Sequence, residues 1–224
     1  TSGTYFVRVS AGSASTTTAA GDYLLSIAKN CQIGGGGGGT GPGADGPGLY
    51  IPASGAFFLR NSNSNGAADV VFTFGAGGAG LVPLTGDWNG DGIDTPGLYS
   101  PTTGAFFLRN SNSNGAADVV FTFGAGGQGF VAITGDWNGD GTDTVGLYLP
   151  STGAFFLRNS NSNGSADLVF TFGAGGQGFT PIDGDWDGNG TDTIGLYLQS
   201  SGAFFLRNAN AGGAADVVLT FGAG

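Results

Sequence analysis

The chain repeats itself with a period of 49 residues, and this period limits the possible folds more than any other feature of the sequence. Each copy runs through GLY, GAFFLRN, an Asn- and Ser-rich stretch, ADVVFTFGAG or a close variant, a short apolar run and an Asp-rich loop. The Gly-Leu-Tyr triplets begin at Gly48, Gly97, Gly146 and Gly195. Since a unit of this length cannot bury its apolar surface alone, we expect neighbouring copies to pack against one another in an array.

We divide the chain into an N-terminal β-hairpin segment, a glycine-rich linker and four tandem repeats. The segment is 1–33, the linker is 34–43 and the repeats occupy 44–224, with whole units at 48–96, 97–145 and 146–194 and a partial unit at 195–224. The partial unit ends after its third expected strand. Residues 4–9 are therefore expected to complete its sheet, either within the chain or in a neighbouring chain, where repetition would build a fibre.

Each unit is expected to contain four short strands joined by tight turns. Gly occurs 48 times among 224 residues, and every acidic residue is Asp, which favours turns, whereas the helix former Glu is absent. The expected strands are GLYSP, GAFFLRN, DVVFTFG and LVPLTGD. In DVVFTFG the period of two places Val70, Phe72 and Phe74 on one face and Val71 on the other.

Apolar residues on both faces indicate small sheets that are covered on both sides. Four strands in 49 residues is also the size of one β-propeller blade. The predicted fold class is therefore all-β, with tandem four-stranded, blade-like repeats. An open or solenoid-like stack of small sheets is the alternative.

The N-terminal stretches TYFVRVSAG and DYLLSIAKN are two strand-like runs around a Ser- and Thr-rich turn. They resemble the last hairpin of the bacterial pre-peptidase C-terminal domain, which implies a secreted bacterial protein. The chain begins at Thr1 and contains no Met, so we expect it to be an excised or matured part of a longer product. The single cysteine, Cys31, has no partner within the chain for a disulfide.

The charge pattern excludes several classes of function. The net charge of -10, with only 6 basic residues, argues against nucleic acid and anionic lipid as partners, and no apolar run has the ~20 residues that cross a bilayer. The chain has no His, so Ser-His-Asp and Cys-His catalysis is impossible. We therefore expect a protein without enzymatic activity.

An Asp-rich loop ends each whole unit, as GDWNGDGIDT from Gly86, GDWNGDGTDT from Gly135 and GDWDGNGTDT from Gly184. Oxygen side chains at positions one, three and five of such a loop converge on one point. A glycine at position six permits the turn, and a carbonyl at position seven adds an oxygen ligand of the kind that Ca²⁺ takes. With the acid at position eight, the candidate ligands are Asp87, Asn89, Asp91, Ile93 and Asp94; Asp136, Asn138, Asp140, Thr142 and Asp143; and Asp185, Asp187, Asn189, Thr191 and Asp192.

These loops resemble the calcium sites of FG-GAP and VCBS-type repeats, which build integrin-like β-propellers in secreted and surface proteins. The resemblance implies about three Ca²⁺ sites and a location outside the cell or on its surface. It departs from the family pattern at the last acid, which lies at position eight instead of nine. This acid, or the threonine that follows it, is therefore the expected source of the last ligand.

Two interpretations of the loops remain open at the level of sequence. In the first, Ca²⁺ clamps the turn between strands; in the second, the Asp and Asn side chains only bond their own backbone in Asx-turns. The ligands are all oxygen and the chain has no His, which excludes a zinc-type site. We favour a structural or adhesive calcium-binding protein that self-associates head to tail, with a glycan-binding propeller as the alternative.

Other repeated side chains have both a structural and a functional interpretation. An Arg follows each FFL and an Asp precedes each VVF or its variant, and we expect these two to pair across neighbouring strands. Trp88, Trp137 and Trp186 lie within the Asp-rich loops. We expect them to pack against the next sheet, whereas a glycan-binding protein would use them as stacking platforms.

Overall fold

The computed structural model of the chain describes residues 24–28 and 46–222, and these residues form 16 strands. Of the two N-terminal strand-like runs, the second contains a strand, Leu24–Ala28. The first run, the linker 34–43 and Cys31 lie outside the described residues. No helix among the described residues is long and apolar enough to cross a membrane.

The strands form four antiparallel sheets of four strands each, which confirms the predicted fold class. Sheet 1 contains β1 (Leu24–Ala28), β2 (Gly46–Ile51), β3 (Ala56–Leu59) and β4 (Val70–Thr73). Sheet 2 contains β5 (Val82–Gly86), β6 (Thr95–Ser100), β7 (Ala105–Leu108) and β8 (Val119–Thr122). Sheet 3 contains β9 (Val131–Gly135), β10 (Thr144–Leu149), β11 (Ala154–Leu157) and β12 (Leu168–Thr171). Sheet 4 contains β13 (Phe179–Gly184), β14 (Thr193–Leu198), β15 (Ala203–Leu206) and β16 (Val217–Thr220).

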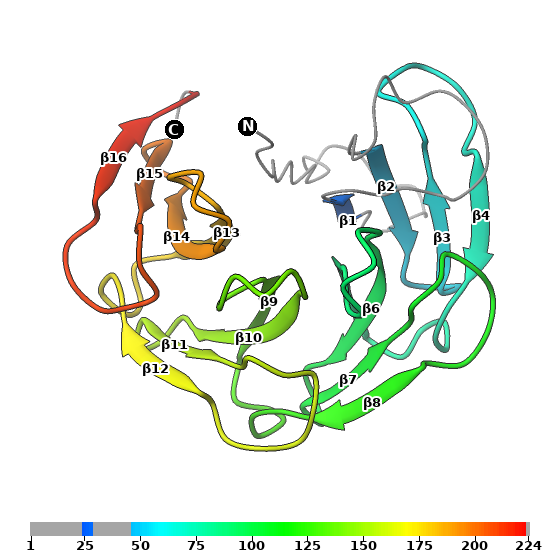
Figure 1. Cartoon of the computed structure of the whole chain (residues 1–224), viewed down its shortest axis with the longest axis horizontal. Coiled ribbons are helices and arrows are strands. Elements are labelled where there is room, and N and C mark those ends of the chain that lie inside the picture. The colour runs from blue at the N-terminus through cyan, green and yellow to red at the C-terminus, as the bar shows by residue number, and fades with distance from the viewer. Residues whose placement is uncertain (1–23, 29–45, 223–224) are drawn as a thin grey trace, which may run out of the picture.

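The four sheets stand around a common centre as the blades of a β-propeller (Figure 1). The first strands of successive sheets contact each other around that centre: β1 contacts β5, β5 contacts β9, and β9 contacts β13. The outermost strands are β4, β8, β12 and β16 (Figure 1). Sheet 1 and sheet 4 are the two ends of this arc, and they stand apart from each other (Figure 1).

The sheets are displaced by one strand from the units that the sequence analysis defined. The LVPLTGD strand pairs with the GLY strand of the following unit, because the Asp-rich loop between them makes a hairpin: Gly86 lies opposite Thr95. Sheet 4 consequently holds four strands without any strand from residues 4–9, which corrects the expectation that its fourth place is vacant. The first place of sheet 1 is filled by β1, from the segment that was assigned to a separate N-terminal hairpin.

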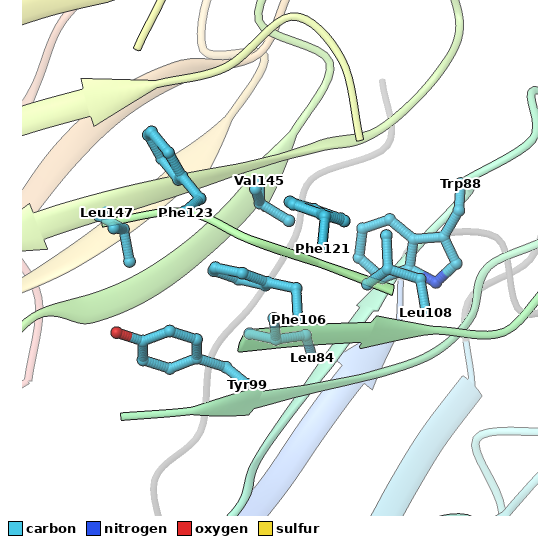
Figure 2. Close-up of a cluster of buried hydrophobic side chains, with 9 residues drawn as sticks. All are labelled: Leu84, Trp88, Tyr99, Phe106, Leu108, Phe121, Phe123, Val145 and Leu147. Atoms are coloured by element: carbon cyan, nitrogen blue, oxygen red, sulfur yellow. The ribbon is translucent and has the colours of Figure 1, made fainter. Parts of the chain in front are cut away.

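Each junction between neighbouring sheets is a separate apolar core. At the junction of sheets 2 and 3, Phe106 and Phe121 of sheet 2 lie against Val145 and Leu147 of sheet 3 (Figure 2). The cross-strand neighbours Tyr99, Phe106 and Phe121 form a ladder with ring centroids 4.6 and 5.3 Å apart. Similar cores join sheets 1 and 2 and sheets 3 and 4. Burial raises the pKa of the Tyr99 hydroxyl above its usual value, as expected for a phenol inside such a core.

The prediction that both faces of each sheet are covered holds for the inner strands and is wrong for the outermost ones. Every residue of β6 is buried. On the outer strands, however, one face stays in solvent, and the exposed fractions of Val71, Val120, Val169 and Val218 lie between 57% and 62%. Neighbouring blades diverge from the centre toward the rim (Figure 1), which is where these exposed valines lie.

Candidate metal site

Each Asp-rich loop joins the first and second strands of one sheet. The loop 87–94 lies between β5 and β6, and its copies lie at 136–143 and 185–192. Gly90 and Gly92 have φ angles of 71° and 84°, a region that side chains with a Cβ rarely adopt, so the sharp turn requires glycine at both positions. The loop therefore closes as the spacing of its glycines predicts.

The aspartate at position one lies inside its own loop. The backbone N–H groups of Asp91 and Gly92 donate to the two carboxylate oxygens of Asp87, at 3.1 and 2.7 Å. Asp136 accepts equivalent bonds from its own loop, including one from Gly141 at 2.7 Å. These are the bonds of an Asx-type turn, and they hold a carboxylate at the centre of the loop.

Positions three and five lie together at the exposed tip of the loop. The Asn89 amide donates to the Asp91 carboxylate at 2.9 Å, and the corresponding distance between Asn138 and Asp140 is 2.8 Å. The third loop exchanges the two residue types. There Asn189 at position five accepts a bond from the Thr191 N–H at 2.8 Å, the bond that Asp140 accepts from Thr142 at 2.9 Å.

The aspartate at position eight bonds to the loop of the preceding sheet. The Asp87 N–H donates to the Asp143 carboxylate at 2.8 Å, and the Asp143 N–H donates to the Asp87 carbonyl at 2.8 Å. Asp192 and Asp136 repeat this pair at 3.1 and 2.8 Å. The sequence analysis considered this acid as a ligand within its own loop. The carboxylates of Asp143 and Asp192 also bond to the loop of the preceding sheet, a contact that the sequence analysis did not foresee.

The donor set that remains in each loop is compatible with one divalent cation of the calcium type. Among the described residues, no three His, Cys, Asp or Glu side chains gather into a cluster suited to a metal. Each loop instead brings together two carboxylates and one amide, at positions one, three and five. Because a carboxylate oxygen has two lone pairs, it can accept a backbone N–H and still ligate a cation. The residues that would hold Ca²⁺ are therefore those at positions one, three and five, together with the position-seven carbonyl, and the acid at position eight stays a predicted ligand.

The Asn- and Ser-rich loop of each sheet supports the Asp-rich loop. The Asn112 amide donates to the Asp94 carbonyl at 3.1 Å, and Asn161 and Asn210 donate to the equivalent carbonyls of Asp143 and Asp192, both at 2.9 Å. The sequence analysis treated these asparagines as turn residues and did not assign them this role. Their unchanged spacing in the repeats is the signal that could have revealed it.

A buried arginine holds the Asn- and Ser-rich loop in shape. The Arg158 guanidinium donates to the hydroxyls of Ser160 and Ser162, both at 2.9 Å, and to the carbonyl of Ser165. It also forms an ion pair with Asp167 at 3.7 Å. Arg60 and Arg207 pair with Asp69 and Asp216 at 3.2 and 2.9 Å. These three pairs confirm the predicted partnership across neighbouring strands.

The same loop also reaches the preceding sheet. The backbone N–H and the hydroxyl of Thr73 donate to the Asn114 side-chain oxygen at 2.7 and 3.1 Å. Thr122 and Asn163 repeat this contact at 2.9 and 3.2 Å. In the fourth repeat Gly212 replaces the asparagine, so the contact to β12 is lost there. Polar bonds thus reinforce the outer rim of two junctions.

Two of the three loop tryptophans belong to the cores, and the third, Trp186, is half-buried. Trp88 and Trp137 are 5% and 3% exposed and pack in the cores between neighbouring sheets. The Trp88 indole N–H donates to the Thr95 carbonyl at 3.1 Å. The prediction that these side chains pack against a sheet is confirmed for both residues, and neither ring face is open to a sugar.

Asp143→Ala is expected to lower the free energy of unfolding by about 1–3 kcal/mol, because the Asp87 N–H loses its acceptor in a buried position. Asp143→Asn should lose less, since its side-chain oxygen can still accept that bond. Urea unfolding of both variants in EGTA measures the difference. Equal stability of wild type and Asp143→Ala would contradict the assigned role.

The fold and the loops together define an all-β, four-bladed β-propeller built from tandem repeats. No protein-family model matches the chain, and no curated protein matches it. Among solved structures, the chain is similar to a crystal structure of BBS1N in complex with ARL6DN, soaked with mercury. The two share 11% sequence identity with a TM-score of 0.47, and the match covers 89% of this chain and 52% of that one, so this chain spans about half its length. The resemblance to FG-GAP and VCBS-type repeats stays a prediction.

Proposed function

We propose that this chain is a non-enzymatic calcium-binding repeat protein that acts as a structural or adhesive module outside the cell or on its surface. The observation that carries the proposal is the common geometry of the three Asp-rich loops. Each holds its position-one carboxylate at the centre by backbone N–H bonds. In the first two loops the position-three amide also bonds to the position-five carboxylate, and in the third the Asn189 N–H donates to the Asp187 carboxylate. Ca²⁺ between these oxygens would offset the repulsion between two carboxylates.

The expected affinity supports a location outside the cell. Calcium modules of extracellular proteins bind with dissociation constants of about 10⁻⁴ to 10⁻³ M. Sites of this strength fill where calcium is near millimolar. Three Ca²⁺ would carry six positive charges and reduce the net charge from -10 to -4. By lowering this negative charge, the bound ions would stabilise the Asp-rich loops, which bond to one another between neighbouring sheets.

We expect calcium to raise the thermal unfolding temperature and EGTA to reverse the rise. At about 1 mM calcium, each site should stabilise the fold by roughly 0.4–1.4 kcal/mol. Mg²⁺ at the same concentration should stabilise it less, because Mg²⁺ demands a tighter octahedral geometry. Calorimetric titration should give a stoichiometry of three.

Asp140→Asn separates ion binding from the fold of the loop. The new side chain keeps an oxygen to accept the Thr142 N–H but loses the charge, so stability in EGTA should match wild type while the calcium response falls by one site.

Asp118→Asn is the matched control, because it removes the same charge from an exposed residue outside these loops and should leave the calcium response intact. Asp143→Asn tests the position-eight acid separately: a calcium response reduced by one site would place its carboxylate in the ligand set, and an unchanged response would exclude it. An unfolding temperature insensitive to calcium would refute the proposal.

The glycan-binding alternative receives no specific support from the site. The sequence-based alternative used the three loop tryptophans as stacking platforms, and the rings of Trp88 and Trp137 are buried while Trp186 is half-buried. The side chains of Asn112 and Asn114 bond within the protein. We therefore retain the calcium-binding module as the proposed function.

A further inference from the structure

The two ends of the arc expose residues that are buried at every internal junction. Phe221 of sheet 4 is 78% exposed, whereas its repeat equivalents Phe74, Phe123 and Phe172 are 3%, 5% and 4% exposed. Leu219 is 42% exposed, whereas its repeat equivalents Phe72 and Phe121 are each 3% exposed. This face of sheet 4 corresponds to the faces that sheets 1, 2 and 3 each bury against the next sheet.

The opposite end of the arc carries the counterpart of this surface. Leu49 of sheet 1 is 41% exposed, whereas its equivalents Leu98, Leu147 and Leu196 are each 1% exposed. Those three leucines are the side chains that each sheet inserts into the face of the sheet before it. Leu49 has no preceding sheet to enter.

A glycine receives the leucine at each internal junction. A Cβ added to Gly124 would lie 2.5 Å from the Leu147 side chain, and Gly173 has the same relation to Leu196. The fourth glycine of this series is Gly222 on sheet 4, and no atom lies within 4 Å of its Cβ position. Sheet 4 therefore presents an open form of the surface that accepts a leucine at the other junctions.

The two ends of the arc also carry the residue types that form a polar contact at the outer rim of internal junctions. At two of the three internal junctions, a threonine of the outermost strand donates to an asparagine of the following repeat, as Thr73 does to Asn114. Thr220 holds the threonine position on β16, and Asn65 holds the asparagine position in the first repeat. The two ends thus match in both their apolar and their polar residues.

We propose that sheet 4 of one copy packs against sheet 1 of a second copy of this chain, in head-to-tail order. Leu49 of the second copy would lie over Gly222, beside Phe221 and Leu219. The contact buries apolar surface that a monomer leaves in solvent, and its geometry already exists three times inside the chain. It joins two complete sheets face to face and needs no exchange of strands. The inference goes beyond the proposed calcium role and stands independently of it.

Such a contact joins two different surfaces, the sheet 4 face of one copy and the sheet 1 face of the next. A dimer therefore keeps one free face at each of its two ends, and further copies can add there. The net charge of -10 on each copy opposes their approach, so added salt should strengthen the association.

Sedimentation velocity over a dilution series tests the proposal, with two variants that each disable one end. Leu49→Asp alters the sheet 1 face and Phe221→Asp the sheet 4 face. Each variant alone should self-associate at least about tenfold more weakly than wild type, because a charge would be buried in an apolar contact. An equimolar mixture of the two should form dimers and no larger species, since one intact pair of faces remains. Val120→Asp, at an exposed residue away from both ends, should behave as wild type.

Three results would overturn the proposal. They are a wild-type protein that stays monomeric at every concentration, a mixture that restores no dimer, and a Val120→Asp variant that disperses the protein as well as the end variants do. Far-ultraviolet circular dichroism checks that each variant is folded. If an aspartate variant fails that check, Leu49→Ser or Phe221→Ser replaces it in the same mixing experiment. Running the series in calcium and in EGTA separates this contact from the proposed calcium role.

Discussion

Phe123→Ala is expected to lower the free energy of unfolding by about 3–5 kcal/mol, one of the largest effects that a single substitution can have in this fold. The Phe123 side chain is 5% exposed and lies in the core between sheets 2 and 3 (Figure 2). Removing the ring leaves a cavity between two sheets, and each sheet is too small to collapse into it. Urea unfolding followed by circular dichroism measures the loss.

Phe221→Ala is the matched control, because Phe221 occupies the same position in the repeat but is 78% exposed. Its replacement should change the free energy of unfolding by less than about 0.5 kcal/mol. Both variants should be measured at low protein concentration, where any contact between copies has dissociated. Equal losses at the two positions would show that the neighbouring sheet does not provide the stability assigned to it.

Gly124→Ala is expected to destabilise the protein by about 2–5 kcal/mol, through two additive effects. The φ angle of Gly124 is 74°, and an L-residue in this region loses about 1–2 kcal/mol. The new methyl group would also lie 2.5 Å from the side chain of Leu147, which is 1% exposed and packed between the two sheets. Overpacking of this kind costs a further 1–3 kcal/mol or so.

Gly127→Ala separates these two effects. Gly127 also has a φ angle of 74°, but no atom lies within 4 Å of its Cβ position. It should therefore show only the backbone effect, and the difference between the two variants measures the contact of Leu147 with the preceding sheet. Thermal and urea unfolding provide both values. A Gly127→Ala variant as unstable as Gly124→Ala would remove the steric part of the argument.

The strands could be predicted from the sequence because their signals are local. Alternating apolar residues and flanking Gly, Asn and Ser residues fix the positions of strands such as Ala105–Leu108 and Val119–Thr122. The assignment of strands to sheets could not be predicted in the same way. The boundaries of a repeat unit are arbitrary in a periodic sequence. The alternation of apolar residues along a strand also does not show which neighbouring strand it pairs with. The hairpin at the Asp-rich loop decides this question, and it places Val82–Gly86 with the following unit.

The candidate site could be predicted only in part, for a related reason. The spacing of Asp87, Asn89 and Asp91 correctly indicates side chains that meet within one loop. The unusual position of Asp143 could not be explained from its own loop, because its partner, Asp87, lies 56 residues earlier. The same holds for Asn114 and Thr73, which are 41 residues apart. Contacts between sheets leave no trace in local spacing, and only the exact recurrence of such residues indicates them.

The displacement of the sheets relative to the sequence units has a consequence for how such a protein can evolve. Sheets 2, 3 and 4 each take their first strand from one unit and their other three from the next, and the pattern recurs at each step of 49 residues. Recombination between two copies of the repeat therefore gains or loses one whole blade wherever the crossover falls, even in the middle of a strand. We expect natural variants to differ in length by multiples of this period, with every remaining junction unchanged.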